Sequence, residues 1–158
     1  MNAFTSHKQF SRLLYTSALD IGHTGERPEQ TARKIAEGSA AHNRLSDLTG
    51  SLVFVDGAFI QILEGPPDEV EKTFERICCD FRHVDVRLID FINVSERLFE
   101  DWDMACLCED KDTSLALRDG LQEIRFLVGI NASQAMLQMR NLLDNQSIAG
   151  NARNSTAI

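Results

Sequence analysis

Residues 48–63, LTGSLVFVDGAFIQIL, decide the fold. They hold two runs that favour β-structure, 48–55 and 58–63, because β-branched and aromatic residues dominate both. Only Asp56-Gly57 separates the runs, and this dipeptide in that position is typical of a type I′ turn. The sequence therefore predicts a β-hairpin.

Both faces of the second strand of this hairpin are apolar. Side chains alternate between the two faces of a sheet, so Phe59 and Leu63 point one way and Ile60 and Ile62 the other. A strand that is buried on both sides needs one layer of structure above the sheet and another below it. The hairpin thus predicts a domain of three layers.

Elements on either side of the hairpin complete the order β-α-β-β-α-β, and one more strand follows. Periodicity and Pro or Gly boundaries predict these flanking elements at 12–17, 28–43, 67–81, 84–92 and 101–108. The second helix is expected to bury a stripe made of Val70, Phe74, Ile77 and Phe81. This order predicts an α+β, ferredoxin-like fold with an added fifth strand and both helices on one sheet face.

The C-terminal third is expected to cover the other sheet face. Four apolar residues recur at helical spacing between 117 and 128, and Ser133 opens a second, short helix. From residue 145 the sequence is small and polar, so we expect a disordered tail. The predicted divisions are an N-terminal extension, a core domain, a helical cap or output segment, and the tail, at 1–10, 11–108, 109–144 and 145–158.

Composition narrows the classes of function. The chain has 158 residues, enough for one domain, and its 24 acidic against 16 basic residues give a net charge of −8. A nucleic-acid-binding face or an anionic membrane surface would favour the opposite sign. There is no apolar run of membrane-spanning length and no signal-peptide pattern at the N-terminus. We therefore expect a cytoplasmic protein that binds neither nucleic acid nor membrane.

Catalytic and metal-binding motifs are missing from the sequence. The four cysteines, Cys78, Cys79, Cys106 and Cys108, lack the spacing of a zinc site, and nothing suggests secretion and disulfides. There is also no nucleophile elbow, zinc-protease helix or phosphate-cradling glycine loop. We expect no metal and no enzymatic activity.

Polar residues at positions that call for apolar ones mark a candidate binding site. Gln61 lies on the sheet face that the first two helices should cover, and Tyr15 in the first strand would place its hydroxyl beneath the same layer. Ser39 and Asn43 lie on the inner face of the first helix. Taken singly, each side chain could simply satisfy a neighbour. Together they indicate a slot for a flat polar ligand.

The ordered set of these pieces resembles the BLUF family of blue-light sensors, which use FAD. The resemblance covers roughly residues 11–108, with compatible spacing, and departs mainly in a longer loop at 18–27. The matching pieces are LLYTS (13–17), AHN (41–43), LTG (48–50), FIQILEG (59–65), Arg76 with Asp80, RHVDVR (82–87) and RLFEDWDM (97–104).

The resemblance implies roles for individual residues, with the flavin ring between the first two helices. Asn43 would bond the carbonyl edge of the ring, and Gln61 would bridge the ring and the Tyr15 hydroxyl. Arg76 and Asp80 would reach the ribityl or phosphate part. The slot would be lined by Ile35, Ser39, Phe59 and Ile77, with His42 as a further hydrogen-bond donor.

The mechanism implied by the resemblance is photochemical. Tyr15 would give an electron and a proton through Gln61, and Gln61 would end rotated or tautomerised, which shifts the flavin absorption to the red. Trp102 and Met104 are expected to share one strand face near the flavin, where one of them approaches Gln61.

No cyclase, phosphodiesterase or DNA-binding pattern accompanies these segments. We therefore expect output through a separate effector protein or through a change of homo-oligomer, with the C-terminal helices as the contact surface. Two alternatives stay open. One is an interaction module that no longer senses light, which the intact Tyr15, Asn43 and Gln61 disfavour. The other is a small ferredoxin-like hydrolase, whose phosphate-binding loop the sequence lacks.

Overall fold

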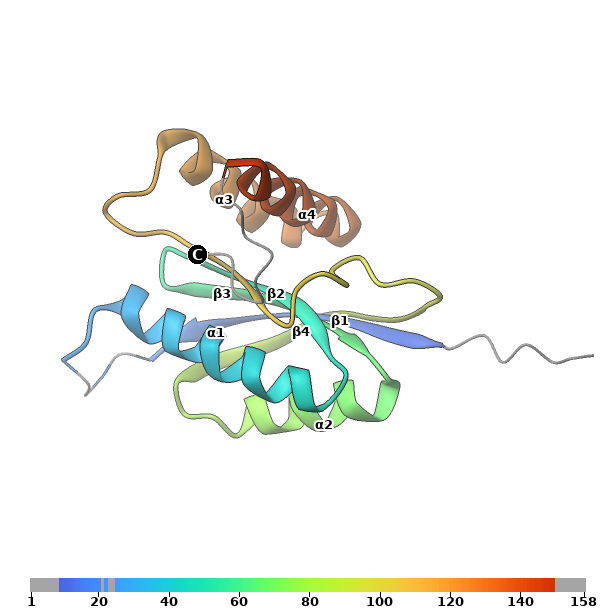
Figure 1. Cartoon of the computed structure of the whole chain (residues 1–158). Coiled ribbons are helices and arrows are strands. Elements are labelled where there is room, and N and C mark those ends of the chain that lie inside the picture. Colours follow the sequence, from blue (N-terminus) through green and yellow to red (C-terminus); the bar gives the residue numbers. More distant parts are fainter. Residues whose placement is uncertain (1–8, 21, 23–24, 150–158) are drawn as a thin grey trace, which may run out of the picture.

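The computed structural model describes residues 9–20, 22 and 25–149, and places one sheet between two layers of helices (Figure 1). The strands are β1 (Phe10–Leu19), β2 (Thr49–Val55), β3 (Ala58–Gly65), β4 (His83–Val94) and β5 (Ala105–Cys108). The helices are α1 (Pro28–Leu45), α2 (Pro67–Cys78), α3 (Leu115–Val128) and α4 (Ala132–Ala149). Within the described part of the chain, no helix has the length and apolarity needed to cross a bilayer.

The sheet has the order β4-β1-β3-β2-β5. β1 is antiparallel to both β3 and β4, β2 is antiparallel to β3, and β5 runs parallel to β2. The hairpin between β2 and β3 turns at Asp56 and Gly57, whose φ angles of 50° and 74° are both positive, as a type I′ turn requires. The predicted ferredoxin-like order with an added fifth strand is confirmed.

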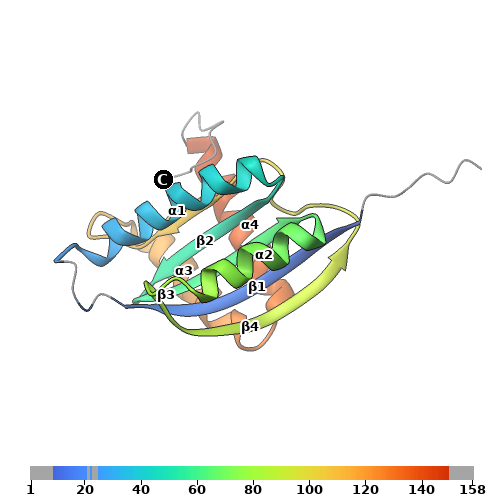
Figure 2. The same cartoon turned by 90° about the horizontal axis from the view of Figure 1, so that it is seen from below.

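Helices cover both faces of the sheet. Figure 2, which looks onto the lower face of Figure 1, shows α1 and α2 lying side by side along it, while α3 and α4 lie on the opposite face. Two cores result. Phe59 and Leu63 belong to the core beneath α1 and α2, whereas Ile60 and Ile62 belong to the core beneath α3 and α4. The alternation predicted for β3 is thus confirmed.

Three expectations about element ends are wrong. Phe81 is 93% exposed because α2 ends at Cys78, before the position at which it would have joined the buried stripe. The last strand begins at Ala105 rather than at 101. Residues 145–149, expected to belong to the tail, are instead helical, because they continue α4, which packs on α3. Residues 150–158 lie outside the described residues.

One buried carboxylate holds the chain between β4 and β5 against the sheet. Glu64, which follows the predicted strand 58–63, lies inside β3 with its side chain fully buried. It accepts hydrogen bonds from Arg12 Nε at 2.7 Å and from the backbone N–H groups of Leu98 and Phe99 at 2.8 and 2.6 Å. Both carboxylate oxygens of Glu64 therefore accept hydrogen bonds from segments that are distant in the sequence.

Replacing Glu64 tests this interpretation. Glu64→Ala leaves the Arg12 guanidinium and two backbone N–H groups without their acceptor, so we expect the free energy of unfolding to fall by about 3–5 kcal/mol. Urea unfolding measures it. Glu71→Ala, on the exposed face of α2, is the matched control and should change it by less than about 0.5 kcal/mol. Equal effects of the two substitutions would contradict the role of Glu64.

Candidate functional site

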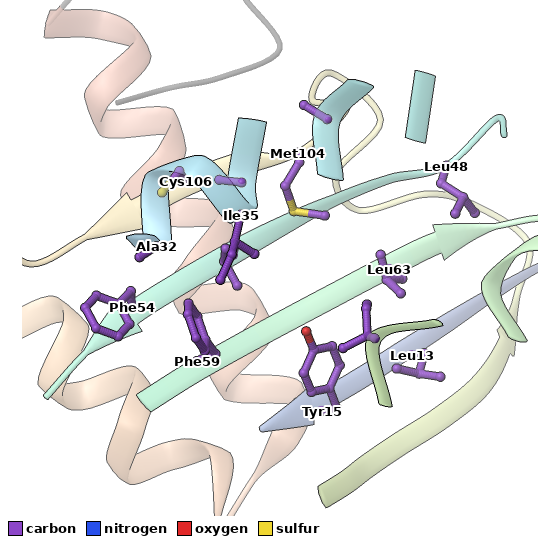
Figure 3. Packing of buried hydrophobic residues seen from close by; sticks show 14 of the residues in the cluster. Leu13, Tyr15, Ala32, Ile35, Leu48, Phe54, Phe59, Leu63, Met104 and Cys106 are labelled. Carbon is purple, nitrogen blue, oxygen red and sulfur yellow. The ribbon is translucent and has the colours of Figure 1, made fainter. Parts of the chain in front are cut away.

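Tyr15 and Gln61 form a buried polar pair at the centre of the sheet. They lie directly opposite each other in the antiparallel register of β1 and β3. Their exposed fractions are 0% and 1%. The Tyr15 hydroxyl donates a hydrogen bond to Gln61 Oε1. Figure 3 shows the Tyr15 ring near Leu13 and Phe59, among the apolar side chains of the core beneath α1 and α2.

The other end of the Gln61 amide faces a weak partner. Gln61 Nε2 lies 3.7 Å from the sulfur of Met104, which is itself fully buried. A thioether is a poor hydrogen-bond acceptor compared with an oxygen. The amide is therefore held firmly through its oxygen and loosely through its nitrogen.

Trp102 lies away from this pair, which corrects the expectation that it shares a face with Met104. Its side chain belongs to the core beneath α3 and α4, and the Arg140 guanidinium stacks 4.8 Å from its ring centroid. Met104 belongs to the core beneath α1 and α2. The reason is that β5 begins at Ala105, so the alternation of a strand does not apply to residues 102–104.

A cavity of about 290 Å³ opens between α1 and α2 and reaches down to Gln61. It is lined by Ile35, Gly38, Ser39, Gln61, Arg76, Ile77, Asp80, Arg82 and His83. Six of these residues were predicted for the slot: Ile35, Ser39, Gln61, Arg76, Ile77 and Asp80. Gly38 contributes open space, since a Cβ there would have no atom within 4 Å. A cavity therefore lies between the two helices where the sequence predicts a ligand slot.

Three of the nine residues predicted to contact the flavin do not line this cavity. Phe59 is fully buried beneath it, and His42 contacts α2 instead. Asn43 is also buried, and its Nδ2 donates to the backbone oxygen of Asp103 at 2.8 Å. Its Oδ1 has no hydrogen-bond partner within the described residues. Because an unpaired buried acceptor costs about 1–3 kcal/mol, this oxygen suits a ligand that brings an N–H group.

His83 is a site residue that the sequence did not single out. It begins β4, its Nδ1 lies 2.8 Å from Ser17 Oγ, and its ring centroid lies 4.8 Å from that of Phe59. Burial lowers the pKa of His83, which the nearby Asp80 partly offsets. The sequence signal that could have indicated His83 was its position beside Asp80 and Arg82, where the chain passes from α2 into β4.

The mouth of the cavity carries a charged pair. Arg82 donates to both carboxylate oxygens of Asp80, with Nη2 2.6 Å from Oδ2. Hydrogen bonds from Arg82 lower the pKa of Asp80, so this carboxylate is ionised at neutral pH. Arg82 was not among the predicted site residues. The lining of the cavity thus ends at the surface in a charged pair.

The described part of the chain contains no cluster of three or more His, Cys, Asp or Glu side chains that could hold a metal ion. The four cysteines are free.

Comparison with known proteins gives the family of this arrangement. The family model described as sensors of blue light using FAD, BLUF, matches residues 10–105. Photoactivated adenylate cyclase subunit beta of Euglena gracilis is 36% identical over 69 residues, which are 43% of this chain and 8% of that protein. The blue light- and temperature-regulated antirepressor BluF of Escherichia coli K12 is 38% identical over 63 residues, 38% of this chain and 16% of that protein. The matched part is thus less than a fifth of either relative.

Solved structures agree with this result. The dark-state structure of BlrB, a BLUF protein, has a TM-score of 0.66 at 22% identity and covers 87% of this chain and 98% of its own; at that identity it shows the fold alone. The ground state of BlsA has a TM-score of 0.58 at 30% identity, over 65% of this chain and 67% of its own.

Tyr15 is the single tyrosine of the chain, so its ionisation can be measured without interference from other tyrosines. Burial raises the pKa of Tyr15 well above its ordinary value, and Cys78 and Asp80 raise it further. A pH titration followed by phenolate absorbance should show no ionisation in the folded protein near pH 10, where a free tyrosine ionises. The same protein in urea should ionise there, and ionisation at an ordinary pH in the folded state would contradict the buried hydrogen bond.

Proposed function

Because this chain belongs to the BLUF family, the sensors of blue light using FAD, we propose that residues 10–105 work as a photoreceptor without catalytic turnover. One observation carries the proposal: the hydrogen bond between Tyr15 and Gln61 lies at the foot of a cavity between α1 and α2. A redox-active side chain and a rotatable amide thus meet where a flat ligand would lie.

The residues around the cavity fit FAD. A volume of about 290 Å³ is near the lower end of small-molecule sites, roughly 300–1,000 Å³, so it suits the ring rather than the whole dinucleotide. Ile35 and Ile77 offer apolar contacts from the two helices. Asn43 does not line this cavity, but its buried Oδ1, unpaired within the described residues, suits the ring N–H that lies between the two carbonyls of a flavin. Arg76 and Arg82 supply positive charge for the phosphates.

In the proposed mechanism, FAD supplies light absorption and, once excited, the ability to oxidise a phenol. Tyr15 holds its proton in the dark because burial raises its pKa. Its electron would pass to the excited flavin while its proton would move along the hydrogen bond to Gln61 Oε1, and both would return to Tyr15 afterwards. The Gln61 amide would be left rotated or tautomerised. A rotation exchanges its two ends, so it replaces both the hydrogen bond from Tyr15 and the weak contact of Nε2 with the Met104 sulfur.

We also propose that the signal passes to a separate protein in the cytoplasm, with a change of homo-oligomer as the other route. The named relatives support modular output, because they include a cyclase subunit and an antirepressor. Exposed apolar side chains on α3 and α4 offer a contact surface. These are Leu115, Phe126 and Leu137, with Ile130 in the connecting turn. Four free cysteines suit a reducing compartment.

The proposed function is tested by the absorption spectrum of the FAD-loaded protein. Blue light should shift the flavin absorption to the red, and the shift should reverse in the dark. Gln61→Leu and Tyr15→Phe should each bind FAD and lose the shift completely, because each removes one side of the buried hydrogen bond. Gln30→Leu, on the exposed face of α1, is the matched control and should keep the shift. A red-shifted light state in Gln61→Leu, or a wild type that binds no flavin, would overturn the proposal.

A further inference from the structure

His42 bridges the two helices that enclose the cavity. It lies in the last turn of α1, and both of its ring nitrogens contact α2. Nδ1 lies 2.6 Å from Arg76 Nη1, and Nε2 lies 3.1 Å from the hydroxyl oxygen of Thr73, which is buried. The imidazole is thus a direct side-chain connection from α1 to α2.

These partners fix the protonation of the ring. A guanidinium has only donors, so Nδ1 must offer its lone pair to Arg76. The single ring proton of the neutral imidazole is then on Nε2, where it is donated to the Thr73 hydroxyl, with Ser46 Oγ at 3.4 Å as a second neighbour. A proton added to Nδ1 would remove the acceptor and place two positive charges side by side. The contact therefore requires a neutral His42.

Arg76 lines the cavity, whereas His42 does not. We propose that His42 is a positioning residue: its neutral Nε2–H form holds the Arg76 guanidinium at the cavity for the ribityl or phosphate part of FAD, and protonation releases it. The part of this inference that concerns FAD rests on the proposed function. His42 then serves the cofactor through Arg76, in place of the direct hydrogen bond that the sequence predicted.

The surroundings of His42 set the direction of its pH dependence. Two charged groups of α2 act on it: Arg76 lowers its pKa and Glu69 raises it. Thr73 and Ser46 are its polar neutral partners. Burial is the largest influence, and the net pKa lies below the ordinary value for histidine. The unfolded chain therefore binds more protons, so the contact is complete above about pH 6.5. It is lost as the pH falls through the lower pKa of the folded protein.

The first test uses the protein without flavin. Imidazole NMR at pH 7.5 should show the Nε2–H tautomer for His42, and a titration should give a pKa below that of free histidine. Arg76→Met should raise this pKa, because it removes both the donor and the neighbouring charge. Lys72→Met, on the exposed face of α2, is the matched control and should leave it unchanged. An Nδ1–H tautomer, or no response to Arg76→Met, would overturn the inference.

The second test measures FAD affinity by the quenching of flavin fluorescence. His42→Ala should weaken binding about three- to tenfold at pH 7.5, the loss expected for one typical hydrogen bond. His42→Asn should stay within about twofold of wild type, since Oδ1 of Asn replaces the Nδ1 acceptor. Between pH 7.5 and 5.5, wild-type affinity should fall more than that of His42→Asn, because both proteins retain His83 and differ only at residue 42.

The two tests separate the possible failures. The expected tautomer together with equal FAD affinity in wild type and His42→Ala would overturn the positioning role while the proposed function stands. A wild type that binds no FAD at any pH would overturn the photoreceptor proposal and the positioning role with it.

Discussion

The register that places Tyr15 opposite Gln61 is the constraint on which the rest of the site depends. The two residues face each other across β1 and β3, inside a core that is otherwise apolar. A slip of one residue between the two strands would turn one of the two side chains to the opposite face of the sheet and leave buried polar groups without partners. The short hairpin between β2 and β3 and the long pairing of β1 with β3 therefore do more than build a sheet. They fix the one hydrogen bond at the foot of the cavity.

The helical layer complements this pair by leaving space above it. α1 has small residues where it faces the sheet, among them Ala32, Ala36 and Ala40, and Gly38 and Ser39 face the cavity. A larger side chain at these positions would fill the space that a ring needs. The contact of His42 with α2 then limits how far the two helices separate. The cavity thus exists because the side chains of α1 are small there and because the His42 contact joins the end of α1 to α2.

Local patterns in the sequence predicted the sheet, its two helical layers and two of the cavity residues, Ser39 and Gln61, whereas the other four came from the resemblance to the BLUF family. They succeeded where one face of an element is buried, because burial imposes a period that can be counted. They failed where a long-range contact decides. Glu64 is buried because Arg12 and two backbone N–H groups converge on it, and His83 belongs to the site because β4 returns beside β1. Neither contact leaves a period along the chain.

Long-range contacts also separate Trp102 from Met104, and this separation has a mechanical consequence. Glu64 fixes the start of the connection to β5 through Leu98 and Phe99, and Arg140 of α4 stacks on Trp102 and donates to the backbone oxygen of Leu98. Two residues further along, Met104 contacts the Gln61 amide on the opposite side of the sheet. One short segment therefore touches the amide with one side chain and α4 with another. A rotation of Gln61 that removes the Met104 contact would act on the same short segment that contacts α4. Only a few residues of the chain therefore separate the cavity from the outer helices.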